Sequence, residues 1–152
     1  MTVPPLSVLF LCSGNSARSQ MAEAILRHLS QGAIDVESAG TVPQDAIHPM
    51  AKRAVRSQLG LEMAGQYPKS LDRFLARHFD YVITVCDRAA ETCPVFPGDP
   101  ERIHWSCDDP AGAVGTGDDK QRAFDTIAQQ LLSQLRLWLS SPAVRRRLET
   151  DP

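Results

Sequence analysis

The chain has 152 residues, a length typical of one domain that buries about two-thirds of its unfolded surface. Its net charge of -2, with 43% hydrophobic and 22% charged residues, gives no reason to expect nucleic acid or an anionic membrane as a partner. No apolar run reaches the ~20 residues of a transmembrane helix, and the N-terminus lacks a signal-peptide pattern. We therefore expect a single cytoplasmic domain over residues 1–152. A monomer is expected because no exposed apolar stripe stands out.

Apolar periodicity divides the chain into strands and helices that alternate. The predicted strands are residues 6–11, 34–39, 81–85 and 102–105. The predicted helices are residues 20–29, 49–59, a short helix that Ser70 caps, and a long helix from about 119 to 139, followed by 143–148 after Pro142. In the short helix, Leu71, Phe74, Leu75 and Phe79 are expected to face the core. Residues 112–118 are glycine-rich and predicted as a loop.

This alternation predicts an open parallel four-stranded sheet with helices on both faces. Ligand sites in such sheets lie beyond the carboxyl ends of the strands. Cys12, Cys86 and Asp109 each follow a predicted strand. We therefore expect the three side chains to meet at one edge of the sheet.

The stretch from Cys12 to Arg18 follows a buried strand and opens a helix. Residues Ser13, Gly14, Asn15, Ser16, Ala17 and Ser19 surround the arginine and complete the loop. Backbone N–H groups at a helix N-terminus bind a tetrahedral oxyanion, and Arg18 adds a planar fork for two oxygens. The same positive field is expected to lower the pKa of Cys12 and make it a thiolate nucleophile. The alternative, a buried structural cysteine beside a tight turn, leaves this combination of residues unexplained.

Cys86 and Cys93 flank a segment of good helix formers. A helix would separate them by about 10.5 Å along its axis, whereas a disulfide needs Cα atoms within about 7 Å. The spacing suits a redox switch that forms its bond only when residues 87–92 unwind, or two small hydrophobic residues in a helix. A zinc site with His104 and Cys107 is a weaker alternative, because no Cys-x-x-Cys motif is present.

Asp109 lies in an Asp-Asp-Pro sequence after the fourth predicted strand. An acid held beside the anion loop is suited to protonate a leaving oxygen. Asp-Pro also makes turns and helix caps, so the residue alone does not decide between the two roles. Cys107 has no assigned role.

Several segments together resemble the thioredoxin-coupled arsenate reductases, which share the fold and anion loop of low-molecular-weight tyrosine phosphatases. The resemblance runs from Val8 to about Leu139. It is carried by residues 10–23, Ser38-Ala-Gly40, residues 81–86 with 90–94, His104-Trp105 and Asp108-Asp-Pro-Ala111. The first segment marks only the fold and its loop, whereas the cysteine pair at 86 and 93 separates reductase from phosphatase.

The resemblance implies a mechanism and its residues. The loop and Arg18 hold arsenate, for which phosphate and sulfate are analogues, while Cys12 attacks arsenic and Asp109 protonates the departing hydroxide. Cys86 then attacks Cys12 and expels arsenite, and Cys93 attacks Cys86. Thioredoxin reduces the resulting Cys86–Cys93 disulfide. No tightly bound cofactor and no metal are expected, and the activity would serve arsenic detoxification.

Two positions depart from parts of this family. Ala17 stands where members often carry a further cysteine. Some members bind a monovalent cation behind the loop, near positions that match Asn15, Glu23 and Ser38, with an acid at the position of Lys69. The Lys69 ammonium could take the cation's place beside Glu23, so a potassium requirement is doubtful.

Two questions stay open at the level of sequence. Phosphate and arsenate have nearly the same shape and charge, so a phosphatase acting on phosphotyrosine or small phosphomonoesters is the alternative function. The sequence Asp109-Pro-Ala-Gly112 lacks the aromatic residues that would stack on a phosphotyrosine ring, and only weak phosphatase activity is expected. A non-catalytic oxyanion sensor would leave the cysteines and Asp109 unexplained.

The second open question is the reductant, which could be glutaredoxin or another thiol in place of thioredoxin.

Overall fold

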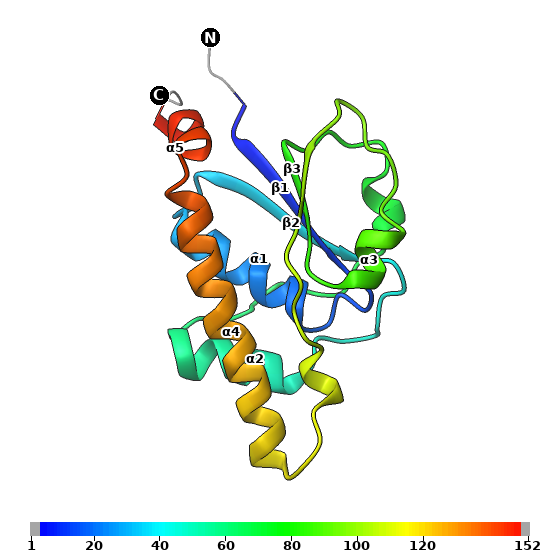
Figure 1. Ribbon diagram of the computed structural model, residues 1–152, viewed down its shortest axis with the longest axis vertical. Coiled ribbons are helices and arrows are strands. Elements are labelled where there is room, and N and C mark those ends of the chain that lie inside the picture. The colour runs from blue at the N-terminus through cyan, green and yellow to red at the C-terminus, as the bar shows by residue number, and fades with distance from the viewer. Residues whose placement is uncertain (1–3, 150–152) are drawn as a thin grey trace.

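The computed structural model describes residues 4–149, which form one parallel sheet with helices packed against it (Figure 1). The strands are β1 (Leu6–Cys12), β2 (Ile34–Gly40), β3 (Tyr81–Thr84) and β4 (Glu101–His104). The α-helices are α1 (Arg18–Leu29), α2 (Pro49–Leu59), α3 (Asp87–Glu91), α4 (Gly117–Leu139) and α5 (Pro142–Glu149). Two short 3-10 helices are η1 (Leu71–Phe74) and η2 (Pro110–Gly112).

The sheet has the strand order β2-β1-β3-β4, and every pair is parallel. β1 is buried along its whole length, because it lies between two strands and two helical layers. In the register of β1 and β2, Cys12 is paired with Gly40. β4 is the edge strand on the far side and is mostly exposed. The predicted four-stranded parallel sheet is therefore confirmed.

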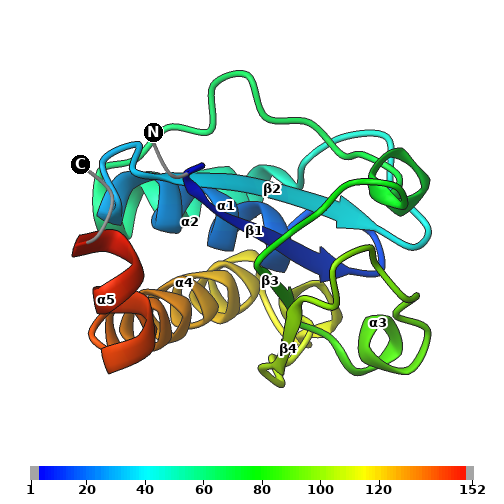
Figure 2. The same cartoon turned by 90° about the horizontal axis from the view of Figure 1, so that it is seen from above.

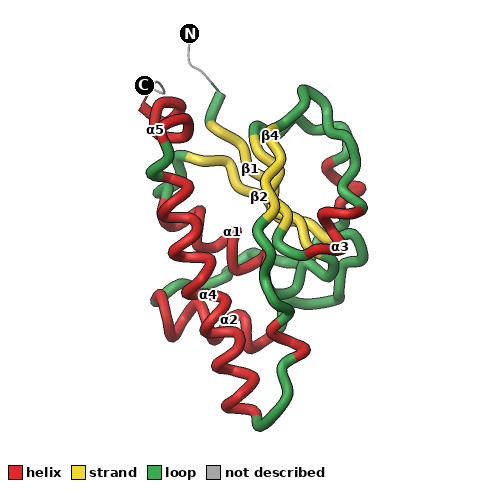
Figure 3. The backbone as a smooth tube through the Cα atoms, viewed as in Figure 1, coloured by secondary structure: helices red, strands yellow, loops and turns green. Residues whose placement is uncertain are grey.

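Helices cover both faces of the sheet, as predicted (Figure 2). α1 and α4 pack on one face with α2 against them, while η1 and α3 lie on the other. The chain between α3 and β4 is mostly loop (Figure 3). Three buried rings pack together on this side, because Phe79 makes edge contacts with Phe74 and with Phe96.

Some predicted boundaries and burials differ from the structure. α1 begins at Arg18, two residues earlier than its apolar pattern. Leu75, expected in the core, is 41% exposed, because η1 ends at Phe74 and Leu75 lies in the turn that follows. Residues after η2 lead into a capping box, in which Thr116 and Asp119 exchange hydrogen bonds, so that α4 begins at Gly117.

Within residues 4–149, no helix is long and apolar enough to cross a membrane. The same part of the chain contains no group of three or more His, Cys, Asp or Glu side chains arranged to hold a metal ion.

The close packing of β2 against the loop after β1 predicts a specific glycine requirement. A Cβ on Gly40 would lie 2.5 Å from the carbonyl oxygen of Ser13, and backbone cannot yield as a side chain does. We expect Gly40→Ala to lower the free energy of unfolding by about 1–3 kcal/mol, measured by denaturant titration. Gly117→Ala is the matched control, because its Cβ would meet nothing within 4 Å. Equal stability of the two variants would contradict the packing argument.

Candidate active site

The loop between β1 and α1 turns its carbonyl groups outward. The carbonyls of Cys12, Ser13, Gly14 and Ser16 accept hydrogen bonds at 2.8–3.1 Å from the N–H groups of Thr41, Val42, Gln44 and His48. With the carbonyls held by this neighbouring segment, the amides are left on the inner side. Within residues 4–149, the N–H groups of Ser13, Gly14, Ser16 and Ala17 have no acceptor. The N-cap residue of α1, Ala17, offers no capping side chain either, so the loop presents free donors to an anion.

Asn15 fixes the shape of this loop from behind. It is fully buried and has a φ of 49°, a left-handed conformation that asparagine tolerates better than most residues. Its Oδ1 accepts from the backbone N–H of Lys69 at 2.8 Å and from Gln20 Nε2 at 2.9 Å. Its Nδ2 donates to Ser19 Oγ at 2.7 Å and Ser38 Oγ at 3.0 Å. All four hydrogen-bonding positions of the amide are used.

The hydrogen bonds of Asn15 also set the direction of the neighbouring hydroxyl groups. Because Asn15 Nδ2 can only donate, Ser19 Oγ accepts from it and is free to donate its own proton to Cys12 Sγ, 2.8 Å away. Asn15 N–H is a second donor to the sulfur, at 3.2 Å. Both donors favour the thiolate.

Burial nevertheless raises the pKa of Cys12 above the ordinary value of a cysteine. The hydrogen bonds from Ser19 and Asn15 and the charge of Arg18 act in the opposite direction, and burial outweighs them. The sequence-based expectation of a lowered pKa is therefore wrong for this loop. That expectation considered the positive field of the loop but not the loss of solvent around Cys12, which is 2% exposed.

A cavity of about 520 Å³ opens above the loop. Its lining residues are Cys12, Ser13, Gly14, Ser16, Ala17, Arg18, Gln44, Ala46, His48, Arg88, Asp109 and Ala111. The predicted nucleophile, guanidinium and acid thus face one space. Asn15 and Ser19, also predicted to bind the anion, do not line the cavity and support the loop from behind.

Asp109 is exposed and caps η2, where its Oδ1 accepts from the N–H of Ala111 at 3.0 Å. Asp109 can therefore cap η2 and still face the cavity, so the two roles suggested by the Asp-Pro sequence do not exclude each other. Asp108 lines a different, smaller cavity with residues of α4. Arg18 Nη1 donates to the carbonyl of Cys107 at 2.9 Å, which ties the chain before Asp109 to the loop.

Cys86 lies next to the loop and Cys93 does not. Cys86 Sγ is buried and lies 3.4 Å from Ser13 Oγ, and the same sulfur accepts from the N–H of Ala89 as the N-cap of α3. Cys93 is half-buried in a separate small cavity beside β4, and burial raises its pKa. Both cysteines are free thiols. The predicted helix between them is present but ends at Glu91, one residue short of the predicted 87–92.

Glu23 and Lys69 form a buried charged cluster below Asn15. Glu23 Oε1 accepts from Ser38 Oγ at 2.6 Å and lies 3.8 Å from Lys69 Nζ, while Oε2 pairs with Arg27 at 2.9 Å. The Lys69 ammonium also donates to the carbonyl of Tyr67 at 3.1 Å and lies over that ring. The structure therefore brings together all four residues predicted behind the loop.

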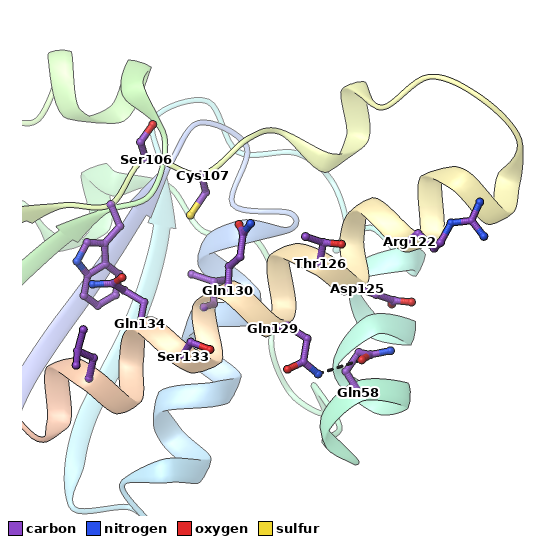
Figure 4. Close-up of a pocket in the computed structure, with 13 residues that line it drawn as sticks. Gln58, Ser106, Cys107, Arg122, Asp125, Thr126, Gln129, Gln130, Ser133 and Gln134 are labelled. Atoms are coloured by element: carbon purple, nitrogen blue, oxygen red, sulfur yellow. Dashed lines mark hydrogen bonds between the residues drawn. The ribbon is translucent and has the colours of Figure 1, made fainter.

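A second cavity, of about 890 Å³, is larger than the one above the anion loop and is separate from that loop. It lies along α4, and its wall is rich in glutamine (Figure 4). Cys107 points into it, and burial raises the pKa of this thiol. Sequence reasoning missed three polar residues that line the cavity above the anion loop: Gln44, His48 and Arg88. The signal for Arg88 was its position two residues after Cys86, at the same edge of the sheet.

A parallel α/β sheet with a cysteine-to-arginine oxyanion loop between its first strand and first helix defines a class of anion-binding enzyme. Residues 7–149 match the family model of the low molecular weight phosphotyrosine protein phosphatases. The chain belongs to this family.

Within the family, the chain is similar to arsenate reductases. It is 36% identical over 129 residues to an arsenate reductase of Halalkalibacterium halodurans, covering 85% of this chain and 91% of the relative. Its fold matches a solved arsenate reductase in its phosphate-binding state, with a TM-score of 0.71, 27% identity, and 89% and 97% of the two chains covered. A thioredoxin-dependent arsenate reductase of Corynebacterium glutamicum has a TM-score of 0.63 and 29% identity, with 91% of this chain and 65% of that chain covered.

The raised pKa of Cys12 predicts how its reactivity depends on pH. A thiol is nucleophilic only after it loses its proton, so alkylation of Cys12 by iodoacetamide should rise with pH beyond the ordinary pKa of a cysteine. Ser19→Ala removes a hydrogen bond that lowers this pKa and should shift the curve to still higher pH. Mass mapping of the Cys12 peptide gives the rate, and Ser133→Ala on α4 is the control. A rate independent of pH above neutrality would contradict the assignment.

Proposed function

We propose that this protein reduces arsenate to arsenite, with Cys12, Cys86 and Cys93 as its redox thiols and thioredoxin as its reductant. The observation that carries the proposal is the position of a second free thiol, Cys86, beside the anion loop, within 3.4 Å of Ser13 Oγ. The similarity to arsenate reductases, one of them thioredoxin-dependent, supports it.

The first half of the reaction uses the cavity above the loop. The loop amides and Arg18 bind arsenate, and phosphate and sulfate are expected to bind there as analogues, since a solved relative was obtained in a phosphate-binding state. Cys12 Sγ attacks arsenic, and Asp109 donates a proton to the oxygen that leaves as water. The product is a thiol ester of As(V) on Cys12, with no change of oxidation state.

The second half transfers two electrons. Cys86 Sγ attacks Cys12 Sγ, the sulfur–arsenic bond breaks with its electron pair left on arsenic, and arsenite departs. Cys93 Sγ then attacks Cys86 Sγ and releases Cys12 as a thiolate, leaving a Cys86–Cys93 disulfide. Two thiols are oxidised for each As(V) reduced to As(III), and the thioredoxin dithiol restores both by disulfide exchange.

A phosphatase would need Cys12, Arg18 and Asp109 but no further thiol. The position of Cys86 as N-cap of α3 beside the loop therefore favours the reductase. Weak hydrolysis of small phosphomonoesters is expected as a side activity, because the loop distinguishes poorly between two tetrahedral anions of similar charge. Among the described residues after Asp109, up to Glu149, only Ala111 lines the cavity, and no aromatic ring does so to stack on a phosphotyrosine.

We also propose that no potassium ion is required. The residues behind the loop do not fit a cation, because the Lys69 ammonium is buried, lies 3.8 Å from Glu23 Oε1 and binds the Tyr67 carbonyl. A monovalent cation would have to displace it against direct charge repulsion. The protein is proposed to act as a monomer in the cytoplasm, where thioredoxin is kept reduced.

The test of the function is arsenate-dependent consumption of NADPH with thioredoxin and thioredoxin reductase. Wild-type protein should turn over many times, and Cys12→Ser should not, because a serine hydroxyl is not ionised at neutral pH. Glutaredoxin with glutathione is the parallel arm that identifies the reductant. Absence of arsenite from the wild type in both arms would refute the proposal.

Replacement of Asp109 by asparagine tests the general acid. The variant should lose roughly 10²–10⁴-fold in the chemical step, the usual range for a lost acid, with little change in phosphate binding because the loop amides are untouched. Asp108→Asn is the matched control, since Asp108 lines another cavity. A loss that fell wholly on phosphate affinity would show that Asp109 acts in binding.

Replacement of Cys93 by serine tests the disulfide relay. This variant keeps Cys12 and Cys86, so it should release about one arsenite per enzyme and then stop as a Cys12–Cys86 disulfide at the buried loop. Cys86→Ser should release none, yet keep any phosphatase activity. Rapid-quench arsenite counts and mass mapping of disulfides give the result. Repeated thioredoxin-driven turnover by the Cys93 variant would mean that the relay does not operate.

A further inference from the structure

The cavity above the anion loop is lined by a second guanidinium group. Besides Arg18, its wall contains Arg88, the second residue of α3. These two side chains approach from opposite parts of the chain, because Arg18 opens α1 and Arg88 follows β3. An oxyanion on the loop amides would therefore have arginines from two elements within the same space.

The two arginines differ in the hydrogen bonds that their guanidinium groups make within the protein. Arg18 donates to the Cys107 carbonyl at 2.9 Å. Arg88 is exposed, and its guanidinium has no hydrogen bond or ion pair with any residue between 4 and 149. Of the carboxylates between residues 4 and 149, only Asp109 lines the cavity, and its Oδ1 accepts from the Ala111 N–H instead. The planar fork of Arg88 is thus free to bind two oxygens of an anion.

The backbone of Arg88 also maintains the helix on which it lies. Its carbonyl accepts from Thr92 N–H at 3.2 Å and from Thr92 Oγ1 at 2.9 Å. These two bonds close the end of α3 immediately before Cys93. The residue that faces the anion cavity with its side chain therefore also holds, with its main chain, the turn that must open before Cys93 reaches Cys86.

We propose that Arg88 is a second oxyanion-binding residue, and that its contact with bound anion keeps α3 helical until the anion has been reduced. The second part rests on the proposed function. Arsenate carries up to two negative charges near neutral pH and attracts both guanidinium groups, whereas the product, arsenious acid, is uncharged there. Reduction therefore removes the charge that holds Arg88, and α3 is released for the Cys86–Cys93 exchange after the Cys12–Cys86 disulfide has formed. No electron donor is needed beyond the three thiols and thioredoxin.

Inorganic phosphate tests the proposal without any redox step. Phosphate affinity is measured by calorimetry, and hydrogen exchange of residues 13–19 and 87–92 is followed with and without saturating phosphate. In the wild type, phosphate should slow exchange in both segments. In Arg88→Met, phosphate should bind about tenfold more weakly, the effect of one lost charge-assisted hydrogen-bond pair. At saturation it should then protect residues 13–19 only.

Two variants complete the comparison. Arg136→Met, at an exposed position on α4, removes the same charge away from the site and should behave as the wild type. Arg88→Lys keeps the charge but not the fork, and should restore part of the affinity. Unchanged phosphate affinity in Arg88→Met, or wild-type protection of residues 87–92 in that variant, would overturn the proposal. Because phosphate is not reduced, this result stands apart from the arsenate assay, whose failure would instead refute the proposed function.

Discussion

The anion loop depends on one buried amide, that of Asn15. A loop that turns its N–H groups inward must keep its carbonyl groups elsewhere, and it must hold a left-handed residue at its tightest point. N–H groups of the segment that follows β2 donate hydrogen bonds to the carbonyls of the loop, and Asn15 adopts the left-handed conformation, with a φ of 49°. Its side chain is then bound on all four sides, so the loop is shaped before any anion arrives. Such preorganisation is what makes a set of weak amide dipoles effective as an anion site.

The same amide connects the loop to the charges behind it. The Lys69 N–H fixes which end of the Asn15 amide is oxygen, and the other end must then donate to Ser19 and Ser38. Ser38 Oγ then donates a hydrogen bond to Glu23, and Ser19 Oγ donates a hydrogen bond to Cys12 Sγ. A chain of hydrogen bonds with one direction thus ends at the sulfur, opposing the effect of burial on its pKa. Glu23, Arg27 and Lys69 do not line the cavity above the loop. Glu23 accepts the hydrogen bond from Ser38, and its ion pairs with Arg27 and Lys69 favour the carboxylate form that can only accept.

Much of this architecture was predictable from the sequence because it follows from local patterns. Apolar runs and periodicity predicted the four strands and their alternation with helices, which implies a parallel sheet. They also predicted that Cys12 and Asp109 meet at one edge of this sheet. Burial and its consequences could not be predicted from local patterns, because they depend on many residues that are distant in sequence and packed around a side chain. The pKa of Cys12 depends on how completely the thiol is buried, and the exposure of Leu75 depends on where a 3-10 turn ends. Arg88 was missed because a lone arginine on a short helix forms no repeating pattern, and its position two residues after Cys86 was the signal that remained.

The two halves of the sheet are built for different tasks. β1 and β2 pair over seven residues, and the loop between β1 and α1 is held by bonds to the segment after β2. β3 and β4 pair over four residues, β4 is an exposed edge, and α3 has five residues, with a cysteine as its N-cap and threonine bonds at its end. An oxyanion site gains from rigidity, whereas a dithiol whose members lie at the two ends of a helix must unwind it to form a bond. Cys86 lies where these two halves meet, because its Sγ is 3.4 Å from Ser13 Oγ of the loop and the residue is also the N-cap of α3. In the proposed mechanism this one sulfur would form a disulfide first with Cys12 at the loop and then with Cys93 at the far end of α3.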